Sequence, residues 1–537
     1  MQFRHTIHST DGIYWTSIPS DPQMQFEAIH MALIPKGTDA GKVLVWDRTN
    51  ITLGGDPPVS WIQRWSVMDP EAQTFQNYSL EIPGANGDFF CAGHAWTWDG
   101  RLLVTGGTAY VSPPPPIFLG LRVTYLFNPD DPAGNGRWRQ QQAMDRPRWY
   151  PTVTLLGDAS DRMVVTGGSN TFPDNPPTDT AINTYEVFLP GALPDGIWES
   201  VGTTRVWPGP RTFSDHPFWY YPRAFALSER AYGGPAGTLK TWLFMGGMYT
   251  KSARLDHVSS PGVWPSWNNP MWPRHPNSNP TIEKKLFGSA VLFPGQEDTV
   301  LHVGGTDDSG APIPSAEYFN NRTAPSQNPV WTPASAMYWS RSRCNAVILP
   351  DGTVLVVGGT RLNGPCDTGG TGTECPVHEP EVYVNGGWTR WSPHASPRTY
   401  HSTAVLLPSG KVLVGGGDTR TWDYEVFSPP YLAKPNRPVW VTWPTTAMGY
   451  DATLSATFET LPLGVTVEKV VLIAPGSVTH HSDMHQRYVS LEIESSETDT
   501  VTFRTPKNRT YAPRGWYMMF LVTDQGLPSV AKFVRLQ

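Results

Sequence analysis

The sequence has little charge and no long hydrophobic segment. Of its 537 residues, 16% are Asp, Glu, Lys or Arg, whereas typical soluble domains have about a quarter. No run of about 18 apolar residues occurs, so no membrane-spanning helix is expected. The net charge of −7 and a pI near 6.1 give no basic surface, so nucleic acid and anionic membranes are not expected as partners.

Targeting and nucleophile signals are also missing. The first residues, MQFRHTIHSTDG, contain no apolar h-region, so no signal peptide is visible and the chain is either a mature form or a cytosolic protein. No G-x-S-x-G elbow supports a hydrolase. Cys366 and Cys375 flank the loop NGPCDTGGTGTECP. A local disulfide is expected between them, which favours a secreted, extracellular or periplasmic location.

Glycine and proline are abundant, with 50 and 54 residues, and they separate apolar strand patterns. One template recurs seven times: an apolar strand, a tight turn, a second apolar strand and, in all copies but the first, Gly-Gly. The copies begin at Ala32, Ala95, Val153, Leu239, Ala290, Ala346 and Ala404. Several are followed by a third strand rich in Tyr or Phe and by a tryptophan. Units of this length with four short strands predict a seven-bladed kelch-type β-propeller over residues 1–430.

The template stops near residues 428–440, and six alternating strand patterns follow without any helical period. They are ATLSATF, EKVVLIA, RYVSLEI, TVTFRT, GWYMMFLV and AKFVRL. Short alternating strands at this spacing predict an immunoglobulin-like β-sandwich over residues 431–537. The predicted fold class is therefore all-β, with a propeller followed by a sandwich.

Residues with redox and metal-binding chemistry stand at similar places in three copies. Cys91, Tyr150 and the pair Tyr400-His401 all lie shortly before a first strand, where the strict alternation of side chains has not begun. Each type alone is usually structural, because a lone cysteine is most often a buried small apolar residue and a buried tyrosine most often a core residue. Their recurrence at one position favours a shared site.

A histidine-rich loop, GSVTHHSDMHQR, lies between two strands of the second domain. His480, His481 and His485 compete as a donor from this loop, and the flanking Gly-Ser-Val-Thr and Gln-Arg favour His480. His94 is interpreted as a pocket or structural residue, and Cys344 as a buried thiol.

These motifs together resemble the copper-radical oxidases, the family that includes galactose oxidase and glyoxal oxidase. The resemblance rests on the kelch copies, FFCAG, RWYPT, RTYHS and GSVTH followed by Gln-Arg, and it covers nearly the whole chain. It implies one copper ion bound by Tyr150, Tyr400, His401 and His480. It also implies a protein-derived cofactor in which Cys91 is joined to Tyr150, which carries the radical, and a role for Tyr400 as base.

The residue types suit that chemistry. Imidazole and phenolate are suitable ligands for tetragonal Cu(II). Copper exchanges one electron at a time, whereas oxidation of an alcohol needs two, so a second redox group must lie beside the metal. The hypothesis is an oxidase that converts a primary alcohol, sugar or small aldehyde and reduces O2 to H2O2, with peroxide-consuming enzymes as candidate partners. The alternative is a non-catalytic kelch propeller that binds a glycan or a protein.

One position departs from the galactose oxidase pattern, in which a tryptophan after Gly-Gly-Ser covers the thioether. Here the stretch reads GGSNTF, with Asn170 at that place. Trp149, Phe172 or an aromatic residue of the segments HPFWYYPRAF and VWPSWNNPMW is expected to shield the radical instead. RWYPT resembles the glyoxal oxidase branch, and the sequence leaves the substrate open.

Overall fold

The structure is a computed structural model of the chain. It describes residues 15–19, 27–48, 62–82, 87–111, 117–170, 182, 184–191, 195–198, 205–206, 220–228, 241–246, 251–257, 272–273, 287–307, 309–320, 331–362, 375–418 and 421–537. Within these ranges nearly all regular structure is strand, and the helical segments are the short 3-10 turns η1 (Asn135–Arg137) and η3 (Pro430–Ala433). The predicted all-β class is confirmed.

Seven antiparallel sheets of four or more strands follow one another along the described part of the chain. The first three contain β2 (His30–Leu33), β3 (Val43–Trp46), β4 (Ile62–Asp69) and β5 (Thr74–Glu81); β7 (Gly93–Trp96), β8 (Leu102–Thr105), β11 (Thr124–Phe127) and β12 (Trp138–Gln140); and β13 (Thr152–Leu155), β14 (Met163–Thr166), β15 (Thr184–Leu189), β16 (Ile197–Trp198) and β17 (Arg205–Val206).

The other four have the same plan. They contain β18 (Arg223–Leu227), β19 (Thr241–Gly246), β20 (Lys251–His257) and β21 (Trp272–Pro273); β22 (Ser289–Leu292), β23 (Thr299–Val303), β24 (Ala316–Asn320) and β25 (Trp331–Pro333); β26 (Asn345–Ile348), β27 (Val354–Val357), β30 (Glu381–Val384) and β31 (Gly387–Arg390); and β32 (Thr403–Leu406), β33 (Val412–Gly415), β34 (Tyr424–Phe427) and β1 (Trp15–Ile18). The N-terminal strand β1 thus completes the last sheet.

The first strands of the sheets form a ring. Contacts run from β2 to β32, β26, β22, β18, β13 and β7 in turn. Between β7 and β2 lies β38 (Ser477–Thr479), which pairs with β2, contacts β7 and β32, and continues into β39 (Ser482–Asp483). A hairpin from the C-terminal part of the chain therefore helps to close the ring.

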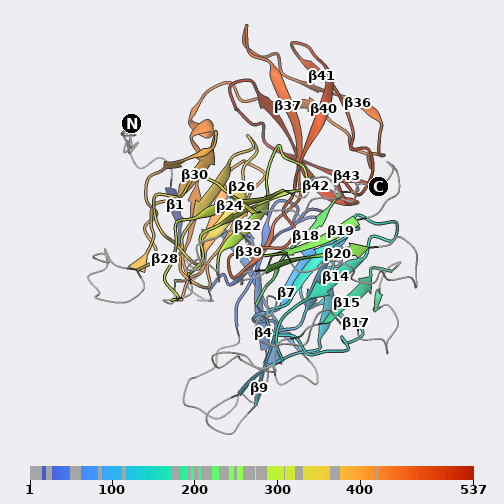
Figure 1. Cartoon of the computed structure of the whole chain (residues 1–537). Coiled ribbons are helices and arrows are strands. Elements are labelled where there is room, and N and C mark those ends of the chain that lie inside the picture. Colours follow the sequence, from blue (N-terminus) through green and yellow to red (C-terminus); the bar gives the residue numbers. More distant parts are fainter. Residues whose placement is uncertain are drawn as a thin grey trace.

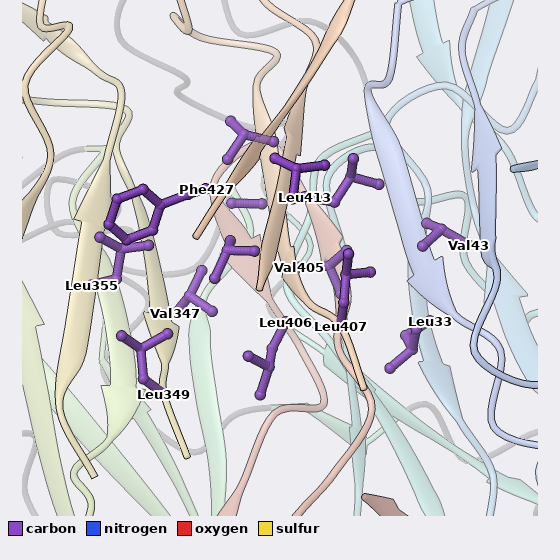
Figure 2. Close-up of a cluster of buried hydrophobic side chains, with 14 of the residues drawn as sticks. Leu33, Val43, Val347, Leu349, Leu355, Val405, Leu406, Leu407, Leu413 and Phe427 are labelled. Atoms are coloured by element: carbon purple, nitrogen blue, oxygen red, sulfur yellow. The ribbon is translucent and has the colours of Figure 1, made fainter. Parts of the chain in front are cut away.

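The strand pairs of neighbouring sheets are apolar because they pack on one another. Figure 2 shows one such cluster, with Val405 and Leu413 of the last sheet between Leu33 on one side and Val347 on the other. All four side chains are almost fully buried, so removing water from them stabilises each junction between sheets. The packing of neighbouring sheets on one another therefore explains why the strands of the repeated template are apolar.

The C-terminal residues form a seven-stranded arrangement that lies at one side of the ring (Figure 1). Its order is β35 (Trp440–Thr442), β36 (Thr453–Phe458), β41 (Thr500–Arg504), β40 (Tyr488–Ser496), β37 (Val467–Ile473), β42 (Gly515–Thr523) and β43 (Lys532–Leu536). All six strand patterns expected from the sequence lie on these strands. Side chains from both ends of the order, among them Trp440 of β35 and Leu536 of β43, share one buried core.

Both faces of β42 are apolar, and one of them packs against the ring. Met519 and Leu521 point into the core of the C-terminal unit, whereas Met518 and Phe520 pack into the cluster of the ring that contains Val405. Successive side chains of a strand point to opposite faces, so a strand that is apolar on both faces serves two cores. The C-terminal unit is therefore docked through a dry apolar face.

Three smaller features complete the description. Strands β6 (Gly87–Asp88), β9 (Thr108–Val111) and β10 (Ile117–Gly120) form a separate sheet, and β28 (Thr360–Arg361) pairs with β29 (Cys375–Pro376). Cys375 is disulfide-bonded, but its predicted partner Cys366 lies outside the described residues, so the pairing stays a prediction. No helix in the described ranges has the length and apolar character needed to cross a bilayer.

Buried arginines recur just before the first strands of three sheets. Each lies with its side chain fully buried, donates to a glycine carbonyl at the end of the second strand and contacts a glutamate on the third. The sets are Arg148 with Gly167 and Glu186, Arg341 with Gly358 and Glu381, and Arg398 with Gly416 and Glu425. The sequence interpretation missed this pattern.

Replacing Arg398 by Met should destabilise the protein by about 3–5 kcal/mol, because it leaves the buried carboxylate of Glu425 without its main partner. The charge pair is 2.8 Å apart, and both side chains are at most 1% exposed. The double variant Arg398→Met/Glu425→Leu removes both charges and should recover part of the loss. Unfolding in guanidinium measures both effects, and an equal loss in the two variants would contradict this account.

Candidate metal and radical site

The candidate site is built from one position that recurs around the ring. Six sheets have a bulky or chemically active residue two places before the first strand, and these residues are Cys91, Tyr150, Tyr221, Phe287, Arg343 and His401. Five of them have positive φ: Cys91 62°, Tyr150 64°, Tyr221 33°, Phe287 61° and Arg343 60°. Such values are rare for bulky residues and are concentrated at functional sites.

Cys91 and Tyr150 come from neighbouring sheets and meet directly. The Tyr150 backbone N–H donates to the carbonyl oxygen of Cys91 at 3.0 Å, and their side chains are also in hydrogen-bond contact. The close approach needs glycine at position 93, where a Cβ would lie 2.5 Å from the carbonyl oxygen of Pro151. The side chains of Cys91 and Tyr150 are 0% and 4% exposed, so both lie in the protein interior.

Tyr400 and His401 lie across the axis from this pair. The Tyr400 hydroxyl donates to the Tyr150 hydroxyl at 3.1 Å. Tyr400 and His401 have ring centroids 4.3 Å apart, so neighbours in sequence lie on the same side of the chain. This is the break in alternation that was expected ahead of β32.

His480 reaches the same place from the C-terminal hairpin. Its ring centroid lies 4.7 Å from that of His401, 5.3 Å from Tyr400 and 5.5 Å from Tyr150. Its Nε2 lies 3.4 Å from Cys91 Sγ. Side chains separated by hundreds of residues in sequence therefore converge on one point.

The tautomer of His480 follows from its hydrogen bonds. The Thr479 hydroxyl lies 3.1 Å from the carbonyl oxygen of Ile29, which can only accept, so the hydroxyl donates to it. The same hydroxyl lies 2.7 Å from His480 Nδ1 and therefore accepts a hydrogen bond from the protonated Nδ1. This leaves the lone pair of His480 Nε2 directed to the site, as a metal ligand requires.

Burial keeps the donors neutral. It lowers the pKa of His480 well below its usual value, with help from neighbouring histidines, and it raises the pKa of both Tyr150 and Tyr400. Burial also raises the pKa of the Cys91 thiol. The site therefore offers the neutral imidazole of His480 and two phenols in an apolar environment, and a cation would be stabilised there by displacing phenol protons.

The competing residues have other surroundings. His94 contacts His30 Nδ1 at 3.1 Å and Ser477 Oγ at 2.6 Å, and burial lowers its pKa to about 3, so it has a structural network. His481 lies beside Tyr220, with centroids 6.1 Å apart. Cys344 is buried with a free thiol.

Aromatic rings cover Tyr150. Trp149 stacks on it with centroids 4.7 Å apart and planes 15° apart, and Tyr220 packs at 4.6 Å with planes 51° apart. Asn170 is exposed and its side chain takes no such place. Phe172 lies outside the described residues. Tyr220 belongs to one of the aromatic segments singled out from the sequence.

The outer rim of the site contains residues that the sequence interpretation did not select. Phe90 lies against His401 with centroids 5.4 Å apart, and the guanidinium of Arg343 lies 5.2 Å from the centre of the Tyr400 ring. Asp418 Oδ1 lies 2.5 Å from His401 Nδ1. Of these residues, Arg343 was detectable in the sequence, because it occupies the repeat position of Cys91 and Tyr150.

The donor set fits one copper ion. The described residues contain no group of three or more His, Cys, Asp and Glu side chains placed to hold a metal, so metal binding here depends on the tyrosine oxygens. Two imidazoles and two phenolates match the ligand preference of Cu(II), and neither ring nitrogen of His401 has an aligned hydrogen-bond partner among the described residues.

Parts of the chain match known protein families, and most of it is similar to known oxidases. Residues 437–536 match the family described as galactose oxidase-like, Early set domain, and residues 311–431 match the glyoxal oxidase N-terminus. A galactose oxidase from Gibberella zeae is 24% identical over 518 residues, which cover 93% of this chain and 67% of that protein. An aldehyde oxidase of Vitis pseudoreticulata is 26% identical over 493 residues, covering 84% of this chain and 82% of the relative.

A solved structure shows the same fold. It is described as a fungal alcohol oxidase of the AA5 family in complex with copper, and it superposes with a TM-score of 0.70 at 20% identity over 97% of this chain and 98% of that one. The family matches span the C-terminal unit and part of the ring, and the relatives span most of the chain. The resemblance to galactose oxidase and glyoxal oxidase, the copper-radical oxidases, that the sequence motifs indicated is therefore confirmed.

Proposed function

We propose that the protein is a copper-dependent oxidase that converts a primary alcohol or small aldehyde with reduction of O2 to H2O2. The observation that carries this proposal is the convergence of Tyr150, Tyr400 and His480 on one buried point beside His401 and Cys91. A propeller that only binds a glycan or a protein has no need to bury two phenols and two imidazoles together.

Tyr150, Tyr400, His401 and His480 would hold the ion. When bound, copper takes up one electron at a time and offers a position to the substrate oxygen. Thr479 keeps the Nε2 lone pair of His480 available, as its hydrogen bonds show. The apolar surroundings exclude water and strengthen every electrostatic interaction in the site.

Tyr400 would act as the base. Burial raises its pKa, so the free protein holds it as a neutral phenol; in the field of a bound cation the pKa falls, and the phenolate can accept the hydroxyl proton of the substrate. Its oxygen lies 3.1 Å from that of Tyr150, so proton acceptance and hydrogen abstraction take place at adjacent atoms. Holding both groups together makes each transfer effectively intramolecular.

Tyr150 would supply the second redox centre after its ring is joined to Cys91. The thiol and a ring carbon each lose one hydrogen, a carbon–sulfur bond forms, and the two electrons and two protons reduce O2 to H2O2. Once O2 has removed one further electron and proton from the joined Tyr150, the resulting radical would take a hydrogen atom from the substrate carbon. The second electron of the substrate would go to the bound copper, and O2 would then accept both electrons and two protons to give H2O2. Trp149, stacked at 4.7 Å, and Tyr220 would shield this ring, whereas a role for Phe172 stays a prediction.

The finer fold assignment is part of the same proposal. The ring of seven sheets of four or more strands, the last of which is completed by β1, supports a seven-bladed kelch-type propeller over residues 1–430. The match of residues 437–536 to the Early set domain supports an immunoglobulin-like sandwich over 431–537. That sandwich lends β38 and β39 to the propeller, so the two units share one sheet.

Location and partners are inferred from chemistry. The disulfide at Cys375 favours an oxidising compartment, so we propose that the protein is secreted. Its substrates would be small alcohols, sugars or aldehydes together with O2, and enzymes that consume peroxide would be its functional partners.

Copper-loaded protein should take up O2 and release H2O2 in equal amounts with at least one substrate from a panel of sugars, simple alcohols, glyoxal and methylglyoxal. His480→Ala should reduce this activity to the level of metal-free protein because it removes a ligand. His485→Ala, on the same loop, is the control and should stay active. Full activity of His480→Ala would show that the ligand assignment is wrong, and no uptake with any substrate would count against the oxidase.

After exposure to copper and O2, the peptides containing Cys91 and Tyr150 should remain joined after reduction and proteolysis. Mass spectrometry should find the joined species two hydrogen atoms lighter than the sum of the separate peptides. Cys344→Ser, which removes the other described free thiol, should leave the crosslink intact. Unmodified, separate peptides from the wild-type protein would contradict the radical mechanism.

Trp149→Leu should shorten the lifetime of the oxidised enzyme about two- to tenfold, because an aromatic contact of this kind is worth about 0.5–1.5 kcal/mol. The decay of the optical absorption of the oxidised form measures that lifetime. Trp198→Leu is the control, since Trp198 packs on Phe188 at 5.2 Å. Equal lifetimes in wild type and Trp149→Leu would exclude Trp149 as the shield.

A further inference from the structure

Asp418 lies directly behind His401. Its Oδ1 is 2.5 Å from His401 Nδ1, and the two side chains are 44% and 8% exposed. The contact lacks the alignment of a hydrogen bond, since His401 Nδ1 has no aligned partner among the described residues. A carboxylate thus stands at Nδ1 of His401, which leaves Nε2 as the other ring nitrogen of this proposed ligand.

The backbone around Asp418 is held against the turn that carries His401 by a hydrogen bond and by close backbone contacts. The Asp418 N–H donates to Thr399 Oγ1 at 3.0 Å. Gly416 packs so closely that a Cβ would lie 2.4 Å from the carbonyl oxygen of His401, and a Cβ at Gly417 would lie 2.8 Å from that of Pro397. The sequence Gly-Gly-Asp after β33 therefore holds the carboxylate at a set place relative to the imidazole.

The other imidazole has a different partner. His480 Nδ1 is held by the neutral hydroxyl of Thr479 at 2.7 Å, and His480 is fully buried. The two imidazoles are therefore not equivalent: one is backed by a carboxylate at the rim and the other by a hydroxyl in the interior.

We propose that Asp418 is a positioning residue that orients His401 and increases its strength as a metal ligand. This inference rests on the proposed copper site. With Nε2 on the metal, Nδ1 retains its proton and donates it to the Asp418 carboxylate, after a small rotation of the ring brings the two into line. A carboxylate in this place fixes the tautomer and raises the basicity of the ligating histidine.

The effect on the metal follows from the charge. A more basic imidazole favours the higher charge of Cu(II) over Cu(I), so Asp418 should lower the reduction potential of the site. Arg343 and Arg48 are cations that act on the same carboxylate, and they limit this effect.

The test compares Asp418→Asn and Asp418→Ala with wild type in the full-length protein. Asp418→Asn keeps the backbone N–H that bonds Thr399, so it removes the charge and preserves the turn. We expect copper affinity, measured by competition with a chelator, to fall about 10–100-fold. We also expect a higher reduction potential and a change in the nitrogen hyperfine pattern of the Cu(II) electron paramagnetic resonance spectrum. Asp418→Glu should restore part of the affinity.

Asp451→Asn is the matched control. Asp451 is an exposed aspartate paired with Arg504 at 2.8 Å in the C-terminal unit, and its replacement should leave affinity, spectrum and potential unchanged. A purely structural role of Asp418 would lower the melting temperature of the metal-free protein and leave the spectrum of the loaded protein as in wild type.

Two outcomes separate this inference from the proposed function. If wild type binds copper and Asp418→Asn has the same affinity, spectrum and potential, the role of Asp418 is overturned, whatever the oxidase activity. If wild type binds copper without oxidising any alcohol or aldehyde, the proposed activity fails, and the comparison of copper affinities still decides the role of Asp418. A wild-type protein that takes up no copper overturns both.

Discussion

The site depends on the insertion of β38 between the first strands of two sheets. This short strand pairs with β2 and contacts β7 and β32, so it helps to close the ring and at the same time presents His480 to Tyr150 and Tyr400. It is held there by the apolar face of β42, whose Met518 and Phe520 pack on the ring. Docking of the C-terminal unit and assembly of the site are thus one event, driven by the burial of apolar surface.

Burial then determines the chemistry that the site can support. The interior offers neutral lone pairs and phenols, because burial opposes charge on His480, Tyr150 and Tyr400. The carboxylate of Asp418 contacts the proposed ligand His401 and is partly exposed at the rim of the site. A cation placed among these donors would gain electrostatic stabilisation from phenolates that the apolar surroundings disfavour in its absence.

The sequence predicted much of both the fold and the site. The strand patterns of the C-terminal unit correspond to observed strands, and the repeated template located the ring, because apolar periodicity reflects burial directly. The sequence motifs alone predicted the site residues, and the structure brings them together. They are Cys91, Tyr150, Tyr400, His401 and His480. Tyr220 was included only as part of an aromatic segment, and Asp418 was missed because its importance comes from its contact with His401. The buried arginines Arg148, Arg341 and Arg398 were missed because the glutamate that each contacts lies on the third strand of its sheet.

By itself the sequence determined the element types, the repeat and the residue types available for redox chemistry, since these follow from local pattern and composition. The tertiary structure decided which of three histidines faces the site, which aromatic ring covers Tyr150 and which ring nitrogen of His480 is free. Trp149 covers Tyr150 although the two are neighbours in sequence, because the positive φ of Tyr150 turns the chain back on itself. The place of His480 depends on its contacts with residues hundreds of positions away in sequence, and no local pattern encodes these contacts.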